Sequence, residues 1–175
     1  MKSILISLLI SFSFVPVSAA TTISSEEFLK AISGDFRGRG SLLIGTSTKQ
    51  ERVACSLKNE LTEAMSELSV RGICATTQGK ISVEGSLKLD SANQINGNFL
   101  SVTDDAVVTK TDSLLTDNLL TISISSKNKE TSVISKTRQT IKPDESGGFL
   151  SLFYKFDEAT SSYLEIGSVK FSSRK

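Results

Sequence analysis

The chain has 175 residues, with 20 Lys or Arg, 19 Asp or Glu and no His, for a net charge of +1. A balanced charge argues against nucleic acid or an anionic membrane as a main partner, because both select proteins with a basic excess. The lack of His excludes the Ser-His-Asp and Cys-His catalytic arrangements, and with only two Cys most routes to zinc, copper or iron are closed. We therefore expect a protein that is not an enzyme and holds no metal or cofactor.

The N-terminal segment has the pattern of an export signal. Lys2 gives a short positive region, residues 4–15 are mainly apolar, and Val17 and Ala19 are the small residues that precede a cleavage point. A membrane anchor is the alternative, but a run of about a dozen residues is shorter than the roughly twenty that span a bilayer. We predict a cleaved Sec-type signal peptide over residues 1–19 and a single domain over residues 20–175. The mature protein would then be periplasmic or secreted from a bacterium, without a membrane anchor.

A short helix is predicted over residues 21–34. Ser24 and Glu27 have the spacing of a capping box, and Gly34 is placed for a C-terminal cap. Phe28 and Ile32 share one apolar stripe, so the helix should lie across a larger apolar surface.

Residues 34–40 follow as Gly-Asp-Phe-Arg-Gly-Arg-Gly. Arg37 and Arg39 are two positions apart, so on a strand they point to the same face, opposite Phe36. The pair could bind a carboxylate or phosphate group of a ligand or partner. The alternative is that both arginines only keep the first strand soluble.

Cys55 and Cys74 are the two cysteines, and in an exported protein such a pair usually forms a disulfide. If they face each other across a hairpin, Leu57 pairs with Gly72. Residues 58–67 also have helical spacing, so the tip of the hairpin could be helical or irregular.

Beyond the helix, apolar and polar residues alternate with the period of strands. Nine strands are predicted, at 36–44, 50–57, 68–76, 80–90, 94–102, 119–125, 132–141, 149–156 and 163–171. They follow one another at short spacing without helices for parallel crossovers, which predicts an antiparallel up-and-down β-barrel. Phe36, Phe99, Ile122, Leu152 and Phe156 are the candidates for its interior.

Acidic residues cluster at Asp104, Asp105, Asp112 and Asp117, amid Thr and Ser. We interpret them as solvated turn residues, because the glycine and alternation of an EF-hand loop are missing. No catalytic residue is predicted.

The step at residues 34–40 after a short helix resembles the first strand of the calycins (lipocalins and relatives), with Phe36 where they carry Trp. That resemblance implies a barrel with Phe36 buried at its closed end. It also implies that a basic residue of the last strand, Lys170 or Arg174, packs over Phe36.

The chain is also similar to a group of small exported alphaproteobacterial proteins of unknown function, with the pattern G-x-W-R-G-x-G, E-R-x-x-C, L-R-C and G-x-W. The corresponding segments here are 34–40, 51–55, 70–74 and 97–99, with Phe36 and Phe99 in place of both Trp residues and two residues inserted before the second Cys. This similarity implies a fold and brings no activity with it.

The sequence thus favours a non-enzymatic binding module for a small apolar ligand or a protein partner. The alternative is a secreted inhibitor or effector that acts on another protein. A cavity lined by Phe99, Ile122, Leu152 and Phe156 would favour the ligand, whereas a filled core with mobile ends would favour docking.

Overall fold

A computed structural model of the chain describes residues 23–44, 49–101 and 106–174. The predicted signal peptide, Asp104 and Asp105 lie outside these ranges. One helix, α1 (Ser25–Ala31), precedes ten strands. The strands are β1 (Gly34–Leu42), β2 (Glu51–Leu61), β3 (Glu67–Thr76), β4 (Gly79–Leu89), β5 (Ile95–Ser101), β6 (Ala106–Thr116), β7 (Leu119–Asn128), β8 (Ile134–Pro143), β9 (Phe149–Asp157) and β10 (Ser162–Ser173).

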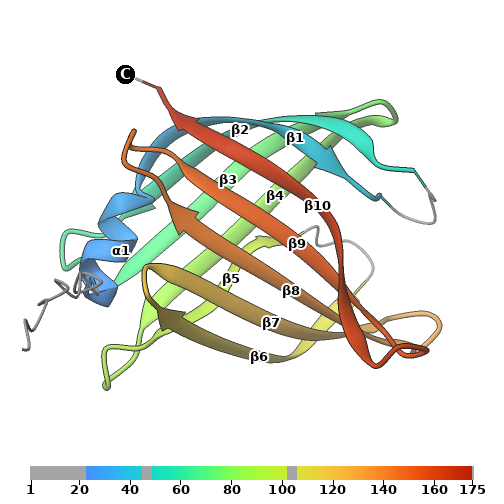
Figure 1. Cartoon of the computed structure of the whole chain (residues 1–175). Helices are drawn as coiled ribbons and strands as arrows, with labels where there is room; N and C mark the ends of the chain where they lie inside the picture. Colours follow the sequence, from blue (N-terminus) through green and yellow to red (C-terminus); the bar gives the residue numbers. More distant parts are fainter. Residues whose placement is uncertain (1–22, 45–48, 102–105, 175) are drawn as a thin grey trace, which may run out of the picture.

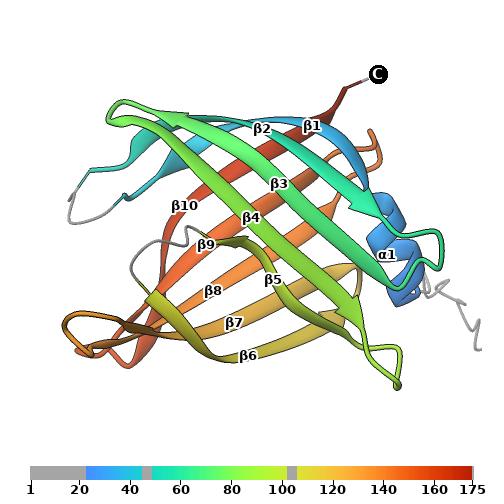
Figure 2. The same ribbon diagram turned by 180° about the vertical axis from the view of Figure 1, so that it is seen from behind.

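The ten strands form one antiparallel sheet in the order β5-β4-β3-β2-β1-β10-β9-β8-β7-β6. Strands next to each other in sequence pair with each other, except β5 and β6, and β1 pairs with β10, which brings the first and last strands together. The sheet curls into a nearly closed barrel, and β5 and β6 are the edge strands of the sheet at the remaining seam (Figures 1 and 2). The predicted all-β up-and-down barrel with a short N-terminal helix is confirmed.

Strict alternation on β2 shows how the sequence directs one face inward. Val53, Cys55, Leu57 and Asn59 are buried, and the residues between them are exposed. Successive side chains of a strand point to opposite faces, so a period of two gives a dry inner wall and a wet outer one.

Helix α1 covers one end of the barrel (Figure 1). The predicted capping box is present: the Ser24 hydroxyl accepts from the N–H of Glu27, whose carboxylate accepts from the N–H of Ser24 at 2.8 Å. Phe28 of the helix and Ile32 at its C-terminal cap are fully buried. Asn59 of β2 fastens the end of the helix, because its Nδ2 donates to the carbonyl oxygen of Ile32 at 2.7 Å.

The half of the barrel under α1 is filled by an aromatic cluster. Phe149 stacks on Phe171 with 4.6 Å between ring centroids, and it meets Phe36 and Phe99 edge-on at 4.9 and 5.5 Å. All four rings are buried. We call this the closed half of the barrel.

The sequence prediction missed one strand and the end of the helix. Ala106–Thr116 forms β6, which places Asp112 within a strand and not in a turn as expected. Asp117 does lie in the β6–β7 turn, with Asn118, and both have positive φ as a tight hairpin requires. The helix ends at a cap on Ile32, so Gly34, at φ 118°, begins β1 and does not cap the helix.

Candidate functional site

The half of the barrel away from α1 contains a cavity of about 340 Å³. We call this the open half. It is bounded by β1 to β5, β9 and β10, and its lining is almost entirely apolar. The lining residues are Leu42, Leu43, Ile44, Val53, Cys55, Cys74, Thr76, Ile81, Val83, Leu100, Phe153 and Val169.

The cavity exists because the inward side chains become smaller along the barrel. In the closed half the interior positions carry four buried phenylalanines that meet one another. In the open half the corresponding walls carry Val53, Val83 and Val169. Side chains of this length do not reach across the barrel, so space remains between them. Interiors are otherwise packed at the density of organic crystals, so a space of this size is a departure from ordinary packing.

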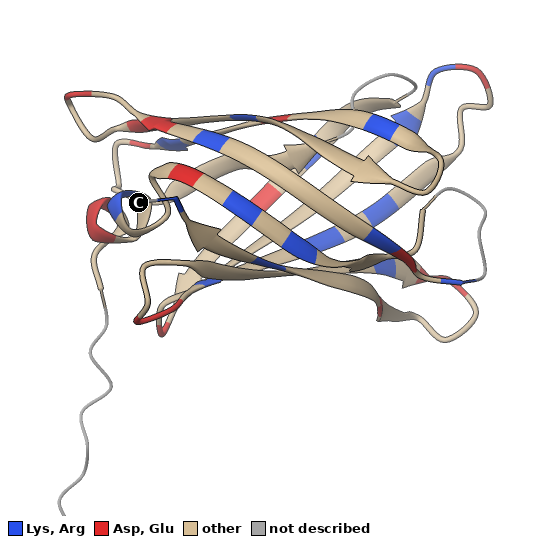
Figure 3. Cartoon of the chain, turned by 90° about the horizontal axis from the view of Figure 1, so that it is seen from above, with Lys and Arg blue, Asp and Glu red and all other residues tan. Residues whose placement is uncertain are grey.

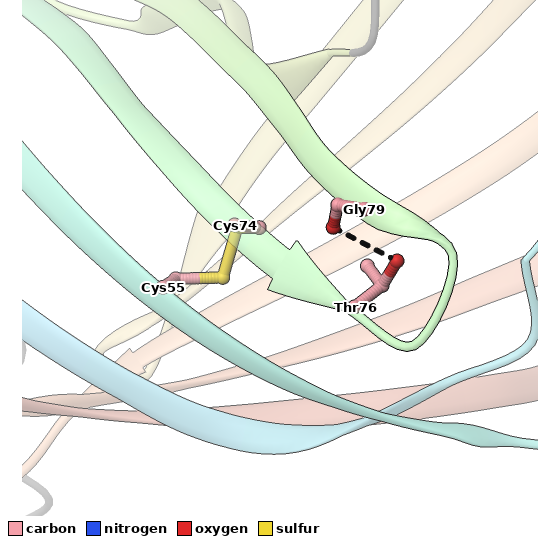
Figure 4. The surroundings of a disulfide bond; sticks show 4 residues. All are labelled: Cys55, Cys74, Thr76 and Gly79. Atoms are coloured by element: carbon pink, nitrogen blue, oxygen red, sulfur yellow. Dashed lines mark hydrogen bonds between the residues drawn. A yellow bond between two sulfur atoms is a disulfide. The ribbon is translucent and has the colours of Figure 1, made fainter.

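A disulfide forms part of the cavity wall. Cys55 of β2 is bonded to Cys74 of β3, as predicted, and the register that pairs them also pairs Leu57 with Gly72. The strands of this hairpin run to Leu61 and from Glu67, so its tip is a short turn with no helix. The bond indicates an oxidising, extracytoplasmic environment. Figure 4 shows it beside the β3–β4 turn, where the Thr76 hydroxyl donates to the carbonyl oxygen of Gly79 at 3.1 Å.

A second cavity of about 320 Å³ lies on the β5–β9 side of the open half. It shares Leu100 and Phe153 with the first cavity, so the two spaces meet at these side chains. Its wall is more polar. Gln139 and Ser151 are buried there, and the Gln139 Nε2 donates to the Ser151 hydroxyl at 2.8 Å. The open half therefore combines an apolar cavity with a neighbouring cavity whose wall carries several polar residues, among them Ser126, Thr137 and Gln139.

The structure separates the five residues expected in the interior. Phe36, Phe99 and Ile122 are buried in the core of the closed half. Leu152 and Phe156 lie on the outer face of β9, which corrects the expectation that they line the barrel. Phe156 packs against Tyr163 at 5.2 Å between ring centroids, and the Lys136 ammonium lies 4.7 Å from the centre of its ring.

The reason for this correction is the register of β9. Phe149 faces inward because it stacks on Phe171, and Ser151 faces inward because it bonds to Gln139. Alternation then turns Leu152 and Phe156 outward. Sequence reasoning followed the larger apolar residues, whereas the buried residue next to Leu152 is Ser151.

Arg37 and Arg39 lie on the outer face of β1 and are exposed. Arg39 is opposite Lys170 of β10 and shares a shallow outer depression with Arg52 of β2. Lys and Arg occur on several strands of the barrel (Figure 3). The arginine pair does not line the cavity, and its role in binding an anionic group remains a prediction.

The basic residue that the calycin resemblance places over Phe36 has a different position here. Lys170 faces outward, with its Nζ 3.9 Å from the Asp144 carboxylate in the β8–β9 turn. Arg174 is tied through its backbone, whose N–H donates to the carbonyl oxygen of Asp35 at 2.8 Å. The ring of Phe149 takes the place against Phe36.

Within residues 23–44, 49–101 and 106–174, no three Cys, Asp or Glu side chains come together in a group that could hold a metal ion. The same residues include no helix long and apolar enough to cross a membrane. The sequence matches no protein-family model, and no curated protein matches it either.

Proposed function

We propose that this protein is a non-enzymatic extracytoplasmic binding module that holds a small apolar ligand in the open half of its barrel. The observation that carries the proposal is the apolar cavity of about 340 Å³ above a filled aromatic core. The filled half gives a rigid floor, and the hollow half gives the space. Binding sites for small molecules are typically preformed cavities of about 300–1,000 Å³ with few polar groups.

The lining indicates the class of ligand. Among the described residues, the wall of the first cavity contains no charged side chain, and Thr76 is the only lining residue with a polar side chain. Apolar cavities without polar partners stay dry and take up apolar molecules. The second cavity adds polar groups, among them Ser126, Thr137 and Gln139, whose Nε2 is hydrogen-bonded to the Ser151 hydroxyl. A neutral molecule that places an apolar body in the first cavity and any polar groups toward the second therefore fits best.

The expected location supports the same function. A disulfide is stable outside the cytoplasm, and the predicted signal peptide over residues 1–19 would deliver the chain there. The resemblance to small exported alphaproteobacterial proteins also agrees with a periplasmic or secreted protein. The alternative of an inhibitor or effector called for a filled interior, and the open half is not filled.

Titration with N-phenyl-1-naphthylamine, an uncharged apolar fluorophore, tests the proposal. We expect saturable enhancement of its fluorescence by the wild type and about a tenfold or greater loss of affinity in Val83→Phe, because Val83 lines the cavity. The added ring enters empty space, so the free energy of unfolding should change by less than about 1.5 kcal/mol. The matched control is Arg37→Gln/Arg39→Gln on the outer face, which should bind as the wild type does. Equal affinity of Val83→Phe and wild type would place the dye elsewhere and contradict the proposal.

A further inference from the structure

The sheet ends at β5 and β6 without closing. Among the described residues, no backbone hydrogen bond joins these two strands, although they border the same seam (Figure 2). β6 is an eleven-residue strand that pairs on one side only, with β7. An edge strand of this length presents a row of N–H and C=O groups that can pair with another strand.

β6 is also unusually exposed and apolar for an edge. Residues 106–110 are exposed on both faces of the strand. Val107 and Leu114 expose 51% and 66% of their surface. The buried hydroxyl of Ser113 has no hydrogen-bond partner among the described residues. The seam therefore leaves both backbone groups and side chains of β6 incompletely satisfied.

A bulge decides which residues share the outer face of β6. The register with β7 shifts between Val108 and Lys110, so Thr109 is the extra residue. As a result Val107, Lys110, Asp112 and Leu114 all lie opposite outward-facing residues of β7. The Lys110 ammonium and the Asp112 carboxylate are 2.7 Å apart on this face, and both side chains are exposed.

This face is complementary to itself. If two copies of β6 run antiparallel about a two-fold axis at Thr111, Lys110 of one copy meets Asp112 of the other, and the reverse contact forms by symmetry. The extra residue Thr109 then brings Val107 opposite Leu114. Opposite charges and apolar pairs across neighbouring strands each stabilise a sheet, and a two-fold interface requires this kind of self-complementary patch.

We propose that β6 is the interface between two copies of this chain, which join their sheets by antiparallel β6–β6 pairing centred on Thr111. The charge pattern selects a second copy as the occupant, because an unrelated strand would have to match the order apolar, basic, acidic, apolar in reverse. Pairing places the second β6 about 4.8 Å from the first. The second strand meets the edge of β6 that faces the seam, where β5, with seven residues the shortest described strand, makes no backbone hydrogen bond to it.

Charge-reversal variants of the full mature chain test this interface, with sedimentation velocity as the measurement. We expect the wild type to dimerise reversibly. Lys110→Asp leaves two acidic residues on each strand, and Asp112→Lys leaves two basic ones, so each variant alone should dimerise at least about tenfold more weakly than the wild type. An equimolar mixture of the two should form a heterodimer, and the double variant Lys110→Asp/Asp112→Lys should recover the homodimer.

Circular dichroism and urea unfolding establish that each variant is folded, which exposed charges on an edge strand should allow. The control is Lys58→Asp, an exposed lysine on β2 with its own ion pair to Glu60, which should dimerise as the wild type does. A wild type that stays monomeric from micromolar to submillimolar concentration would overturn the proposal. A dimer that is insensitive to both single reversals, or a mixture that does not associate, would overturn it as well.

Discussion

Replacing Phe36 with Ala removes the ring that joins the first strand to the aromatic cluster. Phe36 is only 1% exposed, and its ring meets Phe149 edge-on at 4.9 Å. The backbone of β1 is held on both sides, where Phe36 lies opposite Leu57 of β2 and Ser173 of β10, so the walls do not collapse into the space. A Phe-to-Ala change in a core of this kind costs about 3–5 kcal/mol, of which the edge-on aromatic contact contributes about 0.5–1.5 kcal/mol.

Urea unfolding followed by far-ultraviolet circular dichroism measures this loss. If the free energy of unfolding depends on urea concentration with the same slope as in the wild type, the folded and unfolded states have kept their compactness. Phe156→Ala is the matched control, because it removes the same ring from the outer face. Its contacts with Tyr163 and the Lys136 ammonium predict a smaller cost of about 1–2 kcal/mol. Equal losses in the two variants would show that the aromatic cluster is not the packed floor of the barrel.

Two further predictions concern the covalent and electrostatic links of the fold. The Cys55–Cys74 bond closes a loop with a sequence separation of 19, so its reduction should lower the free energy of unfolding by about 3 kcal/mol. Intact-mass measurement with and without reductant checks the bond. Two freely alkylated thiols in native exported protein would refute it. Hydrogen bonds from the Ser146 hydroxyl and from the N–H of Gly148 hold the pKa of the Asp144 carboxyl below its usual value. This stabilisation is present above the unfolded pKa of about 3.9 and is lost as the pH falls through the lower folded pKa, so Asp144→Asn should show a smaller drop of the urea midpoint between pH 7 and about pH 3 than the wild type. Parallel midpoint curves for the two proteins would contradict this role.

The alternation of apolar residues was sufficient to predict the barrel because it is strict where one face is buried. On β2 every second residue is buried, and the cysteine pair fixed the register of β2 with β3. The inner wall of β6 is different, since residues 106–110 are exposed on both faces and the bulge at Thr109 breaks the period of two. Burial alternates again only from Thr111 onward, where the inward residues Thr111 and Ser113 are polar, so the strand could not be recognised from a pattern of apolar residues.

The sequence could not predict the cavity either, and the physical reason is a different one. Periodicity shows that Val53 and Val83 face inward, but it does not show whether side chains from opposite walls meet. That depends on the diameter of the barrel and on the size of the residues across it. On β9 the two faces carry similar apolar residues, and the hydrogen bond between Gln139 and Ser151 turns a serine inward in place of Leu152.

The measurement that tests ligand binding in the open half most directly uses the absence of tryptophan from the chain. Phe153→Trp places a single tryptophan where the two cavities meet, and Phe156→Trp places one on the outer face as the control. Titration with bromohexane, an apolar quencher that acts on contact, should give saturable quenching in Phe153→Trp and only weak, linear quenching in Phe156→Trp. Linear quenching of similar strength in both variants would contradict a ligand site inside the barrel.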